Sequence, residues 1–200
     1  MKTDNFTSGG MVMYTQLTAL DRKFAAIVAG LSLTGYTVKN GDCWNPEDPD
    51  GDKLKHSERT EDRSRTLDIV GDGKWYKYFI ELLIPLDYPE MTPKATFAQW
   101  HEGEYPVASL RYEKGLLEFV TNYASDVFVR KTLPITQGKL TEIVVYLKLD
   151  PGPNAAEIYV EVDDVPMVHL KDHSLVEVGT KPIYFKNGIY RSGMEEARAS

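Results

Sequence analysis

The sequence predicts an all-β protein, a sandwich or barrel of short strands. From residue 56 almost to the end, runs rich in β-branched and aromatic residues alternate with turn signals such as Gly71-Asp72-Gly73 and Asp150-Pro151-Gly152-Pro153. Short strands at this spacing are typical of all-β architectures. No internal repeat, low-complexity tract or linker divides the 200 residues. We therefore expect a single domain over residues 1–200, a length that one large β domain can reach.

The first forty residues carry weaker strand signals than the rest of the chain. Residues 1–10 are polar and glycine-rich, and the apolar spacing within 11–30 fits a helix as well as strands. Residues 31–39 predict a strand, and the Gly-, Pro- and Asp-rich stretch 41–52 predicts a loop. Further strands are expected at 56–70, 74–85, 95–101, 106–112, 115–121, 126–132, 140–150, 156–163, 165–171 and 182–190.

Charge and composition exclude several classes of partner. Lys+Arg 23 against Asp+Glu 30 gives a net charge of -7, which argues against a nucleic-acid binder but allows a locally basic groove for an acidic polysaccharide. The single cysteine, Cys43, excludes an internal disulfide. No apolar run is long enough to span a membrane, and the run 24–33 lacks the position and cleavage site of a signal peptide. We expect neither a nucleic acid nor a membrane as partner.

Three stretches place polar side chains with the period of a strand. Gln99 and His101 point to one face of the strand 95–101, where an amide beside an imidazole could bind a carboxylate and move a proton. Trp100, which lies between them, is expected in the core. A half-exposed strand with a polar outer face would show the same pattern.

The second stretch, 56–65, is too polar for a core strand. If it is extended, Arg59, Glu61, Arg63 and Arg65 share one face and form a basic stripe suited to bidentate capture of carboxylates or sulfates. Glu61 would hold the arginines in place. An exposed edge strand that uses its charges against aggregation is an equally good interpretation.

The third stretch, 184–190, places Tyr184, Lys186, Gly188 and Tyr190 on one face and Phe185 on the core side. A lysine favours the phenolate of a nearby tyrosine, so a tyrosine here could carry a proton. Gly188 leaves room for a ligand to approach the backbone. An ordinary amphipathic strand with tyrosines at the rim is the alternative.

Together, in this order, these stretches resemble the jelly-roll polysaccharide lyases, above all the heparin lyase I-like and glucuronan lyase group and more distantly the alginate lyases. Arg59-Thr60-Glu61-Asp62-Arg63 matches an Arg-Ser/Thr-Glu-x-Arg strand, Gln99-Trp100-His101 a Gln-x-His strand, and Tyr184-Phe185-Lys186-Asn187-Gly188-Ile189-Tyr190 a Tyr-Phe-Lys-x-Gly-x-Tyr strand. The resemblance spans roughly residues 36–192, and residues 1–35 match poorly. It implies a concanavalin-like β-sandwich of two curved antiparallel sheets with a concave substrate groove.

The resemblance also implies β-elimination on a uronic-acid polysaccharide such as glucuronan, alginate or heparin. That reaction needs neutralisation of the C5 carboxylate, for which Gln99 and Arg59 are the candidates, with Arg63 in support. His101 would act as base, and Tyr190 as acid or as both base and acid. Lys186 and Tyr184 would bind substrate. Arg65 of the basic stripe and His56 at the mouth of the arginine strand are further candidates for substrate binding, although His56 alternates with Arg59 and faces the site only if a bulge intervenes. Whether His101 or Tyr190 takes the proton, which polymer is cleaved, and whether cleavage is endo or exo all stay open, as does the oligomeric state.

No cofactor is required for this elimination, and no metal site is expected. Asp48, Asp50 and Asp52 offer hard oxygen ligands at a spacing that does not match an EF-hand, so calcium is only a secondary expectation. A lyase of this kind acts on extracellular polymer. Without a clear signal peptide, release with a phage particle or by lysis would bring it there.

Two other functions are compatible with the same fold. A non-catalytic carbohydrate-binding or structural jelly roll could use the groove, but such a protein needs no proton carrier beside a carboxylate clamp. A glycoside hydrolase would need two facing carboxylates, and Glu58, Glu61 and Glu81 form no convincing pair. The sequence therefore favours a lyase.

Overall fold

The protein is an all-β sandwich, as the sequence predicts. The computed structural model describes residues 13–15, 23–28, 31–36, 58–64, 73–88, 94–102, 105–121, 129–149, 155–175 and 183–191, and within these ranges every regular element is a strand. The strands are β1 (Met13–Thr15), β2 (Lys23–Val28), β3 (Leu31–Tyr36), β4 (Glu58–Ser64), β5 (Trp75–Leu83), β6 (Ala95–Glu102), β7 (Tyr105–Glu113), β8 (Leu116–Thr121), β9 (Val129–Pro134), β10 (Leu140–Leu149), β11 (Ala156–Val162), β12 (Val165–His173) and β13 (Tyr184–Arg191).

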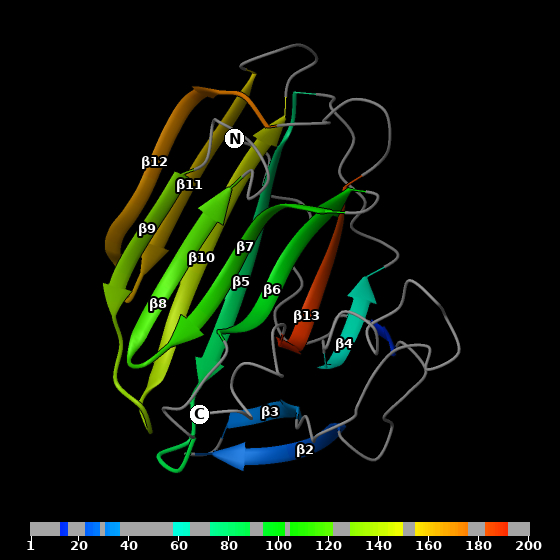
Figure 1. Ribbon diagram of the computed structural model, residues 1–200, viewed down its shortest axis with the longest axis vertical. Coiled ribbons are helices and arrows are strands. Elements are labelled where there is room, and N and C mark those ends of the chain that lie inside the picture. Colours follow the sequence, from blue (N-terminus) through cyan, green and yellow to red (C-terminus); the bar gives the residue numbers. More distant parts are fainter. Residues whose placement is uncertain are drawn as a thin grey trace, which may run out of the picture.

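The strands form two main antiparallel sheets and a separate hairpin (Figure 1). The larger sheet has the order β1-β4-β13-β6-β7-β8-β9, the smaller has the order β12-β11-β10-β5, and β2 pairs with β3. The last strand, β13, lies between β4 and β6. This crossover places the three polar stretches of the sequence on neighbouring strands, although 119 residues lie between the end of β4 and the start of β13.

The core lies between the two main sheets. Along β11, buried and half-buried residues alternate, as expected for a strand with one face on a core. Tyr78 of the smaller sheet packs against two aromatic side chains of the larger one, with ring centroids 5.2 Å from Trp100 and 5.0 Å from Phe185. Trp100 is fully buried, which confirms its predicted place on the core side of β6.

Irregular pairing in β6 and β13 decides which residues share the outer face of the larger sheet. The register shifts between Thr96 and Ala98, and both Phe97 and Ala98 belong to the core. Thr96 therefore lies on the same outer face as Gln99, which simple alternation would not give. A matching shift in β13 includes Gly188, whose φ of 140° is open to glycine but strained for other residues.

The strand expectations from residue 56 onward are confirmed, with ends that differ by a few residues. The ambiguous stretch 11–30 contains the two strands β1 and β2, in place of the helix that its apolar spacing also allowed. The late strand expected at 165–171 continues to His173. Of the stretch 56–70, the structure describes only 58–64, as β4.

Candidate active site

Two rows of residues cross the outer face of the seven-stranded sheet, because directly opposed residues on neighbouring strands point to the same side. The strand register defines them as Arg63–Lys186–Gln99–Ser109–Val120–Arg130, called here the glutamine row, and Arg59–Tyr190–Thr96–Arg111–Glu118–Thr132, called here the tyrosine row. His101 lies opposite Tyr184, on the other side of the glutamine row. Residues from all three family-like strands therefore share one face.

Glu61 joins the three strands through buried contacts. Its carboxylate accepts a 2.7 Å hydrogen bond from Nε2 of Gln99 and lies 3.4 Å from Nζ of Lys186. Glu61 is 3% exposed, and both partners are also buried. A carboxylate removed from water to this extent needs such partners, so the three side chains hold one another in place.

The contact with Glu61 also fixes the amide of Gln99. A carboxylate only accepts hydrogen bonds, so the Gln99 group that meets it must be the NH₂ and not the carbonyl oxygen. The same NH₂ carries a second hydrogen. Gln99 can therefore donate to a ligand carboxylate while it stays bound to Glu61.

His101 is held by Tyr184. The Tyr184 hydroxyl lies 3.2 Å from Nδ1 of His101, and the two rings are stacked with centroids 5.4 Å apart. If Nδ1–H donates to the hydroxyl, Nε2 keeps its lone pair and can act as a base. If the hydroxyl donates to Nδ1, Nε2 carries the hydrogen and His101 can only donate. The direction of this hydrogen bond therefore corresponds to the tautomer of His101 that faces a ligand.

Tyr190 lies in the tyrosine row, on the far side of Gln99 from His101. Its partner Thr96 and His101 are five positions apart on β6, so their rows are separated by roughly 16 Å at about 3.3 Å per residue. His101 and Tyr190 therefore flank Gln99 and Lys186. Both side chains must lean toward the glutamine row to reach one sugar unit.

The arginines of the predicted basic stripe are only partly placed. The backbone of Arg63 is paired with Lys186 and that of Arg59 with Tyr190, which aligns β4 with the site. The side chains of Arg59 and Arg63 lie outside the described part of the structure, as do all of Arg65 and His56. Their roles in substrate binding stay predictions.

Sequence reasoning did not assign a binding role to Glu61 or to the charged residues on β7 and β8. Glu61 shares its parity with Arg59 and Arg63, so its position on the same face was visible in the sequence, but its partners on β6 and β13 were not. Arg111 and Glu118 belong to expected neighbouring strands joined by the turn Glu113-Lys114-Gly115. Their pairing could have been found from that hairpin.

The described residues contain neither a candidate metal centre nor a helix that could span a membrane. Among them, no group of three or more His, Cys, Asp or Glu side chains could hold a metal ion. Within the same ranges, no helix is long and apolar enough to cross a membrane. Asp48, Asp50 and Asp52 lie outside the described residues, so calcium in that loop stays a secondary prediction.

Comparison with known proteins supports the fold through structure and not through sequence. No family model and no curated protein matches the sequence. An endo-β-1,4-glucuronan lyase from the fungus Trichoderma reesei aligns with a TM-score of 0.53 and 10% identity, over 85% of this chain and 76% of that one. An alginate lyase of polysaccharide lyase family 7 aligns at 0.47 and 16% identity, over 90% of both chains. A β-glucanase catalytic domain from Podospora anserina aligns at 0.46 and 14% identity, over 80% of this chain and 72% of that one. The likeness to the glucuronan lyase shows a shared jelly-roll fold.

Proposed function

We propose that this protein is a polysaccharide lyase that cleaves a uronic-acid-containing polysaccharide by β-elimination and leaves an unsaturated uronate end. The observation that carries the proposal is the contact set on one sheet face, in which Glu61 holds Gln99 and Lys186 beside the His101–Tyr184 pair. β-Elimination needs a group that binds the uronate carboxylate and a group that moves a proton, and the amide of Gln99 and the imidazole of His101 are suited to these two tasks.

Gln99 and Arg59 would neutralise the C5 carboxylate, with Arg63 in support. Both arginines belong to β4, which is separated from the strand of Gln99 by β13. Lys186 adds little net charge at this point because Glu61 offsets it. The guanidinium groups would supply the positive charge, and the second N–H of Gln99 would fix the orientation of the carboxylate. Stabilising the negative charge that develops on the carboxylate lowers the barrier to removal of the C5 proton.

The proton steps use His101 and Tyr190. The C5–H bond breaks, its electron pair forms the C4–C5 double bond, and the C4–O bond breaks as the leaving oxygen receives a proton. His101 takes the C5 proton through Nε2 when Nδ1–H is directed at Tyr184. Tyr190 supplies the proton to the leaving oxygen, or performs both steps. No cofactor is needed for this balance of bonds and protons.

A glycoside hydrolase is the main catalytic alternative, but the acidic residues fit it less well. Hydrolysis would need two carboxyl groups that face each other across a glycosidic bond, one to donate a proton and one to attack or activate water. Glu61 is already bound to Gln99 and Lys186, and Glu118 is surrounded by three cationic side chains. Neither carboxylate is placed as a free acid or nucleophile.

One assay separates a lyase from a hydrolase and from a binding protein. The protein is incubated with glucuronan, alginate and heparin while the ultraviolet absorbance of unsaturated uronate ends is followed. Rising absorbance is the expected result. New reducing ends without that absorbance would indicate hydrolysis, and binding with neither product would indicate a non-catalytic carbohydrate-binding protein.

His101→Ala and Tyr190→Phe test the assigned proton carriers. Each variant should lower turnover by about 10²- to 10⁴-fold, the usual contribution of a general acid or base, while circular dichroism shows an intact fold. Near-normal turnover in either variant would remove that residue from the mechanism.

A further inference from the structure

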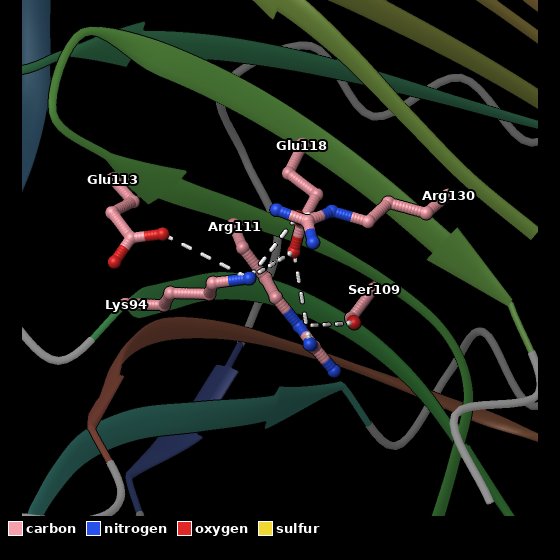
Figure 2. Close-up of polar contacts among 6 residues, drawn as sticks. All are labelled: Lys94, Ser109, Arg111, Glu113, Glu118 and Arg130. Carbon is pink, nitrogen blue, oxygen red and sulfur yellow. Dashed lines mark hydrogen bonds and ion pairs between the residues drawn. The ribbon is translucent and has the colours of Figure 1, made fainter.

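A second cluster of charged side chains lies on the outer face of the larger sheet, away from the His101–Tyr184 pair. Figure 2 shows Lys94, Arg111 and Arg130 converging on the carboxylate of Glu118. Nζ of Lys94 lies 3.2 Å and Nη1 of Arg111 3.8 Å from that carboxylate, and Nε of Arg130 contacts it directly. Lys94 also lies 3.8 Å from Glu113.

This cluster, called here the Glu118 cluster, carries more positive than negative charge. Three cationic groups meet the two carboxylates of Glu118 and Glu113, which leaves one positive charge in excess. The Glu118 side chain is 4% exposed, whereas Arg130 is 49% and Lys94 33% exposed. The carboxylate is thus covered by its cations, and Arg130 and Lys94 present their outer sides to solvent.

The Glu118 cluster is continuous with the candidate active site. Arg111 and Glu118 belong to the tyrosine row, and Arg130 ends the glutamine row. Nε of Arg111 also donates a 3.1 Å hydrogen bond to Ser109, which lies directly opposite Gln99 on β7. A rigid chain of opposed residues therefore connects the proposed carboxylate clamp with the cluster.

We propose that the Glu118 cluster is a remote subsite for the carboxylate of a uronate unit that is not itself cleaved. Arg130 and Lys94 would contact the carboxylate of this unit, while Glu118 and Ser109 hold Arg111 beneath them. A partly exposed guanidinium with a fixed orientation is suited to a carboxylate, and it loses less water on binding than a fully exposed one. This inference rests on the proposed function for the identity of the polymer.

The subsite gives the polymer a direction across the sheet. Gln99 on β6 and Glu118 on β8, whose carboxylate Arg130 contacts, are separated by two strand spacings, roughly 10 Å at about 4.8 Å per spacing, and they also lie in different rows along the strands. A chain that reaches from the clamp to Arg130 must therefore cross the strands and extend over several sugar units. Short oligosaccharides held at the clamp would not reach the cluster, so the enzyme should prefer long chains.

Arg130→Gln tests the subsite, and Lys131→Gln is its matched control. Both variants remove one positive charge from β9, but Lys131 is the next residue along the strand, outside the two rows, and exposed. Binding of glucuronan, alginate and heparin is measured by affinity electrophoresis at low and high salt. For the polymer that binds most tightly, Arg130→Gln should weaken binding about three- to tenfold. This loss lies between the contribution of an exposed ion pair and that of a hydrogen bond to a charged group. The loss should shrink at high salt.

Lys131→Gln should bind like the unaltered protein, and Lys94→Gln should repeat the loss seen in Arg130→Gln. Thermal unfolding shows that the variants are folded. Equal affinities of Arg130→Gln and Lys131→Gln, or no binding of any of the three polymers, would overturn the subsite.

The absorbance assay on the unaltered protein separates this result from the proposed function. If Arg130→Gln alone loses affinity for the polymer and the unaltered protein forms no unsaturated ends from any polymer, the subsite is supported and the lyase activity is refuted. If the unaltered protein forms unsaturated ends but Arg130→Gln and Lys131→Gln bind the polymer equally well, the lyase activity is supported and the subsite is refuted.

Discussion

Replacing Glu61 by glutamine should destabilise the protein far more than a typical surface substitution. The change keeps the shape of the side chain but removes the negative charge that lies 3.4 Å from the buried ammonium group of Lys186. Removing one partner of a buried ion pair costs about 3–5 kcal/mol. For a chain of this length, that corresponds to a fall in Tm of roughly 6–20 °C.

Urea and thermal unfolding, followed by circular dichroism, measure this loss. Glu157→Gln is the matched control, because its side chain is 30% exposed and its contacts, 3.6 Å to His169 and 3.8 Å to Lys171, lie at the surface of the smaller sheet. It should cost less than about 1 kcal/mol. Adding Lys186→Met to Glu61→Gln removes the buried positive charge and should recover part of the stability. If the free energies of unfolding of Glu61→Gln and Glu157→Gln differed by less than about 1 kcal/mol, the buried contacts of Glu61 could not be what holds the site together.

Three further predictions concern the orientation of the base, the core and the response to acid. Tyr184→Phe removes the hydroxyl that contacts His101, so it should shift the pH profile of turnover as well as lower turnover, whereas a purely structural role would change stability alone. Trp100→Ala should cost about 3–5 kcal/mol of unfolding free energy, because the indole is fully buried against Tyr78 and Phe185, and the half-buried Trp75→Ala should cost less. Burial lowers the pKa of His173 below its ordinary value of 6.5, so the unfolded chain binds this proton more readily than the folded one. The free energy of unfolding should therefore be highest above about pH 6.5, where His173 is neutral in both states, and should decline as the pH falls below that value. Urea unfolding should show a smaller decline in His173→Gln.

Most of the strands could be predicted from the sequence because period-two patterning and turn residues are local signals. The run 156–163 alternates clearly and is found as β11, with the turn at Asp163-Asp164. Trp100 could be assigned to the core for the same reason. In the stretch 11–30, the spacing of the apolar residues is compatible with a helix and with short strands. The pairing of β1 with β4 and of β2 with β3 decides in favour of strands.

The site could be predicted only as separate strands. The family-like motifs gave Gln99, His101, Tyr184 and Lys186, and the structure brings these side chains together. The insertion of β13 between β4 and β6 is a long-range pairing with no local signal. The register shift at Phe97 of β6 also escapes simple alternation, which would have placed Thr96 with Trp100 on the core side. The sheet register was therefore needed to place Tyr190 relative to Gln99.

The role proposed for the contacts of Gln99 and His101 is β-elimination on a uronate. It is tested most directly by following the ultraviolet absorbance of unsaturated uronate ends while the unaltered protein acts on glucuronan, with alginate and heparin in parallel. We predict that the absorbance rises with at least one polymer and that His101→Ala abolishes most of the rise. Cleavage that produces reducing ends without this absorbance, or no cleavage of any of the three polymers, would contradict the claim.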